Sequence, residues 1–130
     1  MRYALMLLIG LLAGFLMSSV ATRALGQRHA WPRSVMTLIG VHHRALKREL
    51  AAPACRRAAA DRELDRMAWL SDEIGPAFAE RDDPVFAGYR DDLQQAIART
   101  RAAVTADCAA LVLPVQGITR ACENCHRDYR

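Results

Sequence analysis

The sequence predicts an all-α fold, an antiparallel up-down-up-down four-helix bundle preceded by an N-terminal hydrophobic signal or anchor helix. Three observations predict it. The 130 residues include only 6% aromatic residues, 7 glycines and 5 prolines, and good helix formers such as alanine, leucine and arginine dominate. Apolar residues recur at helical spacing in four stretches of residues 31–130. Proline, glycine or aspartate bounds these stretches, so the connections are short and neighbouring helices should run antiparallel.

The composition excludes several classes of protein. With 52% hydrophobic and 25% charged residues, the chain is typical of a globular domain and not of a disordered one. The net charge of +4 comes from basic residues that alternate with acidic ones, so we expect no nucleic-acid binding. The sequence contains neither a Ser-His-Asp set nor a glycine-rich phosphate loop, and we therefore expect a protein that is not an enzyme.

The first segment directs the chain to a membrane. Residues 3–20 carry no charge, and Ser19-Val20-Ala21 supplies the small residues that signal peptidase requires. The uncharged run also approaches the ~20 residues that span a bilayer. We therefore assign residues 1–21 to a signal peptide or a membrane anchor, 22–30 to a linker and 31–130 to the four-helix bundle.

The first two helices of the bundle are bounded by prolines. The first is predicted to begin at Trp31-Pro32 and to run to about Leu50. The second follows Ala52-Pro53 and ends at Gly75-Pro76. The inward positions are Val35, Met36, Ile39, His43 and Leu46 in the first helix, and Leu64, Met67, Ala68 and Ile74 in the second.

Aspartates begin the last two helices. Asp83-Pro84 caps the third, and Asp107 is a candidate N-cap of the fourth. Pro114 should kink the fourth helix or delay its regular part. The inward positions are Phe86, Tyr89, Leu93, Ile97 and Val104 in the third helix, and Leu111, Val115, Ile118, Cys122, Cys125 and Tyr129 in the fourth.

One motif near the C-terminus carries chemistry. Cys122-Glu123-Asn124-Cys125-His126 is a C-x-x-C-H sequence, which attaches c-type haem. Two thiols three residues apart on a helix can add to the two vinyl groups of one porphyrin, and the histidine that follows can ligate the iron. A thioredoxin-like pair would normally follow a strand, and a zinc site would need further ligands at matching spacing. We therefore favour haem over both alternatives.

The ending Cys122-x-x-Cys125-His126-x-x-Tyr129-Arg130 resembles that of the cytochrome c-prime family, including its low-spin c-556 relatives. The stretch Arg33-Ser34-Val35-Met36-Thr37-Leu38-Ile39-Gly40 is similar to the first-helix pattern of that family. The resemblance covers residues 31–130. It implies a four-helix bundle with one covalent haem c in the periplasm, and a possible homodimer. It also implies His126 as the proximal iron ligand, Arg130 beside the proximal face and Met36 on the distal side.

The position of Met36 along the bundle agrees with a distal role. At ~1.5 Å per residue, Met36 lies ~7.5 Å from the predicted start of the first helix, and His126 lies ~6 Å from the C-terminal end. His42 and His43 would lie ~10 Å further along. Met36 then either ligates the iron or packs over an open distal position.

These two alternatives correspond to two functions. Ligation by Met36 suits electron transfer with a periplasmic or membrane redox partner. An open distal position suits binding of a small gas such as nitric oxide.

Two cysteines remain outside the motif. Cys55 follows the first turn and Cys108 begins the fourth helix, so an up-down-up-down bundle places both at one end, away from the haem. An exported protein can keep a disulfide. We predict a Cys55–Cys108 bridge, with two buried thiols as the alternative.

Overall fold

The computed structural model describes residues 2–81, 83–103 and 107–129, without the side chains of residues 2, 4, 5, 8 and 23–29. Every element among the described residues is a helix and none is a strand, which confirms the predicted all-α fold. The elements are α1 (Arg2–Ala51), α2 (Arg57–Asp72), α3 (Ile74–Ala77), α4 (Pro84–Ala102), the 3-10 helix η2 (Cys108–Leu111) and α5 (Val112–Asp128).

Helix α1 begins earlier than the sequence predicts. It is continuous from Arg2 to Ala51 with Pro32 inside it, so the predicted start at Trp31-Pro32 is wrong and residues 22–30 are helical. These residues include alanine, leucine, arginine and glutamine, which favour helix. The chain divides into two compact units, Met1–Arg33 and Ser34–Arg130. Within the described part of the chain, no helix is both long and apolar enough to cross a bilayer.

The other helix ends follow the local signals closely. Asp83 is the N-cap of α4 and accepts the Val85 N–H at 2.9 Å. Asp107 accepts the Ala110 N–H at 3.2 Å and opens η2. The regular helix α5 begins only at Val112, with Pro114 in its first turn, which is the predicted delay.

The boundary after α2 differs from the prediction. Helix α2 ends at Asp72, and Gly75 and Pro76 lie inside the short helix α3 instead of after the last helical turn. A proline in a first helical turn removes no intrahelical hydrogen bond, because the N–H groups there have no intrahelical partner. The short helix adds the buried Ile74 to the core.

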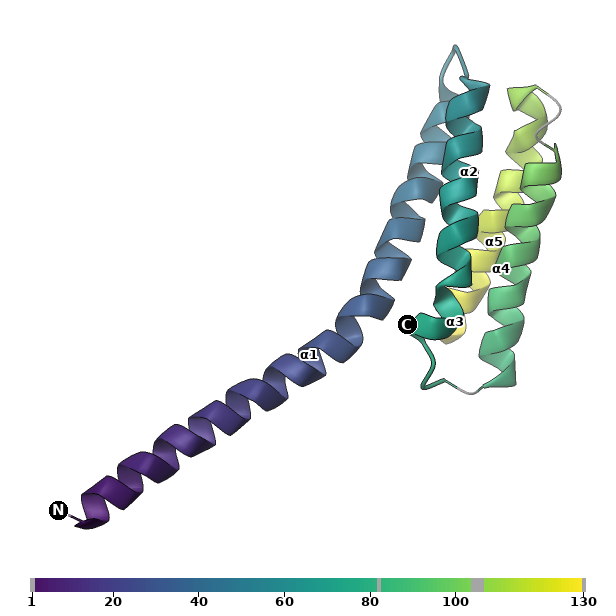
Figure 1. Cartoon of the computed structure of the whole chain (residues 1–130). Coiled ribbons are helices and arrows are strands. Elements are labelled where there is room, and N and C mark those ends of the chain that lie inside the picture. The colour runs from purple at the N-terminus through teal and green to yellow at the C-terminus, as the bar shows by residue number, and fades with distance from the viewer. Residues whose placement is uncertain (1, 82, 104–106, 130) are drawn as a thin grey trace. The chain divides into compact units, whose positions relative to one another are not determined.

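The core lies within Ser34–Arg130, where the second half of α1 and helices α2, α4 and α5 lie side by side (Figure 1). Most predicted inward positions are buried, and Met36, Ala68, Cys122 and Tyr129 pack against the core at its margin. Val104 lies outside the described residues. The buried cluster is Val35, Ile39, Leu46, Ala60, Leu64, Met67, Leu70, Ile74, Phe86, Leu93, Ala96, Ile97, Leu111, Val115, Ile118 and Ala121.

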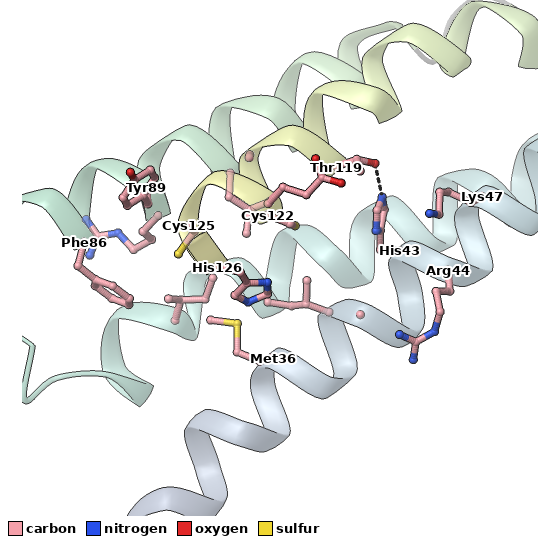
Figure 2. Close-up of a pocket in the computed structure, with 17 residues that line it drawn as sticks. Met36, His43, Arg44, Lys47, Phe86, Tyr89, Thr119, Cys122, Cys125 and His126 are labelled. Carbon is pink, nitrogen blue, oxygen red and sulfur yellow. Dashed lines mark hydrogen bonds between the residues drawn. The ribbon is translucent and has the colours of Figure 1, made fainter. Parts of the chain in front are cut away.

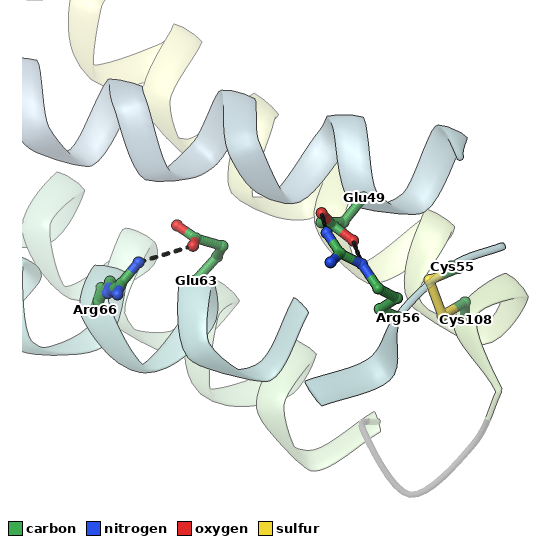
Figure 3. A network of polar contacts seen from close by, with 6 residues as sticks. All are labelled: Glu49, Cys55, Arg56, Glu63, Arg66 and Cys108. Atoms are coloured by element: carbon green, nitrogen blue, oxygen red, sulfur yellow. Dashed lines mark hydrogen bonds and ion pairs between the residues drawn. A yellow bond between two sulfur atoms is a disulfide. The ribbon is translucent and has the colours of Figure 1, made fainter. Parts of the chain in front are cut away.

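A disulfide joins two connections of this unit. Cys55, in the connection before α2, is bonded to Cys108, the first residue of η2, with 6.3 Å between their α-carbons. This confirms the predicted bridge. Beside it, Arg56 donates to Glu49 at 2.6 Å and so ties the end of α1 to the start of α2 (Figure 3).

Candidate functional site

The C-x-x-C-H motif occupies the last two turns of α5. The helix buries Val115, Ile118 and Ala121 upstream of the motif, and this stripe continues into the half-buried Cys122 and Cys125. Two residues three apart on a helix lie on the same face. Both thiols are therefore directed toward the interior of the bundle, and His126 lies at its edge with an exposed side chain.

The motif residues line a cavity of about 300 Å³ between α1, α4 and α5. Ile39, Phe86 and Leu93 supply apolar walls. Met36 of α1 lines the same cavity, and in Figure 2 it points toward His126. The structure therefore brings Cys122, Cys125, His126 and Met36 together around one cavity.

Burial sets the protonation state of the two free thiols, Cys122 and Cys125. It is the largest cause of the raised pKa of both Cys122 and Cys125, and the neighbouring Cys125 and Glu123 raise the pKa of Cys122 further. Both cysteines therefore remain in the neutral S–H form at neutral pH. A redox-active C-x-x-C pair needs the opposite, a thiol whose pKa is lowered at a helix N-terminus. This environment counts against the thiol-redox alternative.

His42 and His43, the histidines of α1 whose side chains the structure describes, have different environments. His43 lines the cavity, and its Nε2 lies 3.1 Å from Thr119 Oγ1. Because the Thr119 hydroxyl donates to the Val115 carbonyl at 3.2 Å, Oγ1 accepts the His43 Nε2 proton. Burial lowers the pKa of His43, and the nearby Lys47 and Arg44 lower it further. His43 is thus a neutral residue that faces Thr119, away from His126 (Figure 2).

His42 does not line the cavity. Its Nδ1–H donates to Glu63 Oε2 at 2.6 Å, and Glu63 Oε1 also accepts from Arg66 at 2.9 Å. The residue therefore connects α1 to α2. In Figure 2 His43 is not placed beside His126, but the count of levels that predicted this for both histidines assumed a helix start near Trp31, which the continuous helix α1 does not have.

Several side-chain contacts near the site were not predicted from the sequence. Tyr89 lines the cavity and donates to Asp128, and Tyr129 donates to Asp83. Thr119 could have been found, because it stands one helical turn before Cys122 on the same face. The tyrosine–aspartate pairs have no such signal, since each joins residues of different helices. Arg130 lies outside the described residues.

Comparisons with known proteins give one clear result. No family model matches the chain, and no curated protein matches it either. Among solved structures, cytochrome c′ from Rubrivivax gelatinosus matches with a TM-score of 0.67 and 22% identity, over 77% of this chain and 91% of that chain. The fold is that of a cytochrome c′. The match agrees with the fold that the resemblance in the sequence implies.

The residues present fit the haem that this fold implies. The cavity contains two thiols and the His126 imidazole on adjacent turns of α5, which is the donor set for covalent haem c. Among the described residues, no group of three or more His, Cys, Asp or Glu side chains could hold a metal ion by itself. The cytochrome c′ fold thus presents its C-x-x-C-H motif to an interior space that a flat apolar group could fill.

Proposed function

We propose that the chain is an exported, periplasmic c-type cytochrome that binds one haem covalently and transfers electrons. Cys122 and Cys125 would form the two thioether bonds, and His126 would bind the iron. Residues 1–21 would direct export, and residues 31–130 would form an up-down-up-down bundle. The carrying observation is that the three motif residues and Met36 line one cavity of a cytochrome c′ fold.

Bound haem would supply a reversible one-electron iron couple, and the chain would tune it. The apolar residues of α1 and α4 that line the cavity, among them Ile39, Phe86 and Leu93, would lower the local dielectric constant around the group. Met36, which faces His126 across the cavity, is the candidate sixth ligand. Methionine ligation raises the potential of haem iron, and a complete ligand set limits rearrangement during electron transfer. Neither role requires turnover of a substrate, so we propose a protein that is not an enzyme.

Binding of a small gas such as nitric oxide is the second candidate function, and one feature of α1 favours it. The wall opposite His126 combines Met36 and Ile39 with Gly40, which has no side chain. An apolar wall of this kind can leave an axial position open and accessible to a neutral diatomic ligand. The spin state of the iron separates this candidate from electron transfer.

Absorption spectra of the chain matured with a haem-attachment system test the proposal. We expect covalent haem, with sharp low-spin bands in the reduced protein that nitric oxide leaves unchanged. Broad high-spin bands that shift with nitric oxide would instead select gas binding. A variant with Cys122→Ala and Cys125→Ala should lose the haem, whereas the matched variant with Cys55→Ser and Cys108→Ser should keep it. No covalent haem in the unaltered chain would refute the proposal.

A further inference from the structure

The end of α5 is joined to α4 by two hydrogen bonds that run in opposite directions. Tyr129, which follows α5, donates to Asp83 at the start of α4. Tyr89, one turn into α4, donates to Asp128, the last residue of α5. Each helix therefore supplies one phenol and one carboxylate. We call these two bonds the tyrosine–aspartate crosslinks.

The Tyr129 crosslink is supported by its surroundings. Asp83 is already oriented as the N-cap of α4, because its other carboxylate oxygen accepts the Val85 N–H. The Tyr129 ring packs edge-on against Phe86, with 5.3 Å between the ring centroids. The Arg81 guanidinium lies over the Tyr129 ring, 5.4 Å from its centre. These contacts hold the Tyr129 phenol in one place.

The crosslinks act on the turn that carries the proposed iron ligand. The last carbonyl groups of a helix have no intrahelical partner, and helix ends commonly fray. Here the Tyr129 N–H donates to the Cys125 carbonyl at 2.9 Å, so that a fixed Tyr129 also holds the last turn. Among the described residues, the His126 side chain makes no hydrogen bond. Its position therefore depends on the backbone of this turn.

We propose that the tyrosine–aspartate crosslinks are a positioning device, which holds Cys125 and His126 beside the cavity before haem binds and constrains His126 afterwards. Tyr89 and Tyr129 are positioning residues in this scheme, because they act on the iron ligand through the helix end. The constraint on His126 after haem binds rests on the proposed haem function. The hydrogen-bonded structure of the last turn in the chain without haem does not depend on that proposal.

Two measurements on the full chain test the device. Tyr89→Phe and Tyr129→Phe, alone and together, remove the phenol oxygens and keep the rings. In the chain without haem, we expect faster hydrogen exchange at the Tyr129 amide, by about five-fold for each hydrogen bond removed. In the haem-loaded chain, we expect the iron–histidine stretching band in the resonance Raman spectrum to shift in the double variant.

Asp72→Asn is the matched control, because Asp72 accepts from Gln94 at 3.0 Å, a hydrogen bond that joins α2 to α4 and involves no residue of α5. It should leave both readouts unchanged. An unshifted iron–histidine band in a folded double variant, or an equal shift in the control, would overturn the positioning role. If the double variant does not fold, the single variants and Asp128→Asn decide the same question. If the unaltered chain binds no haem, the proposed function fails and the exchange rates still decide the crosslinks.

Discussion

At the scale of single residues, two side chains far apart in the sequence control the proposed iron site. His126 comes from the last turn of α5 and Met36 from the middle of α1, and both line one cavity. Met36 is half-buried and unbranched, and its flexible thioether would be free to approach the iron while Val35 and Ile39 beside it stay buried.

Replacing Met36 tests its place at the iron. In Met36→Ala, we expect the reduced spectrum to change from low-spin to high-spin and the midpoint potential to fall, because a methionine sulfur stabilises reduced iron. The exposed Leu38, on the same helix, is the matched site, and Leu38→Ala should leave the spectrum and the potential unchanged. Unaltered spectra and ligand binding in Met36→Ala would show that this residue does not face the iron.

Tyr129 should make the stability of the fold depend on pH in the alkaline range. Its hydrogen bond to Asp83 is the main cause that raises the pKa of Tyr129 to about 12, from 10.0 for a free phenol. A raised pKa means that the folded state favours the neutral phenol, so this contribution is complete below pH 10 and is lost as the pH rises through about 12.

Unfolding curves measured by circular dichroism across this range test the effect. In Tyr129→Phe, the part of the stability that disappears between pH 10 and about 12 should be absent. Trp69→Phe, at an exposed aromatic residue of α2, should keep the pH dependence of the original chain. A Tyr129→Phe chain with an unchanged alkaline profile would contradict the assignment.

At the scale of the elements, the disulfide connects two segments that lie between the long helices. Cys55 lies before α2, and Cys108 begins η2, with a sequence separation of 53 between them. A crosslink over such a distance restricts the unfolded chain more than the folded one. It does so away from the residues that line the cavity.

Removing the bridge should therefore affect stability and spare the site. We expect a chain with Cys55→Ser and Cys108→Ser to lose about 2–4 kcal/mol in free energy of unfolding. Its haem spectrum should match that of the original chain. Denaturant titration gives the loss, and the intact mass before and after reduction verifies that the original chain contains the bridge. Equal stability of the two chains would contradict the prediction.

At the scale of the whole molecule, the buried cluster belongs to one of the two compact units. All of its described members lie within Ser34–Arg130. The hydrophobic residues described between Tyr3 and Val20 are exposed instead, including Phe15 and Met17 at 73% and 76%. Burial of apolar surface is the main favourable contribution to folding, so the second unit should account for the stability of the fold.

A chain without residues 1–30 should consequently fold like the full chain. We expect its free energy of unfolding to agree with that of the full chain within about 0.5 kcal/mol, since no buried core residue is removed. Thermal or denaturant unfolding of both chains measures this. A large loss of stability in the shorter chain would show that residues 1–30 contribute to the core after all.

Local patterns were sufficient for much of the fold and for part of the site. Asp83, Asp107 and Pro114 act where the sequence predicted, because a cap or a proline acts on the turn in which it stands. Pro32 misled the prediction for the same reason. It is equally compatible with a helix start and with a helix interior that tolerates one missing hydrogen bond, and the local pattern does not distinguish them.

An all-helical chain with a C-x-x-C-H motif could be read from the sequence, because helical spacing and this motif are properties of neighbouring residues. What surrounds the motif became known from the packed fold. In the fold, Met36 lies across the cavity from His126 and His43 is hydrogen-bonded to Thr119. Tyr89 and Tyr129 are hydrogen-bonded to Asp128 and Asp83. These contacts depend on how each helix is rotated against the next. That rotation is set by the joint packing of buried side chains from distant parts of the chain.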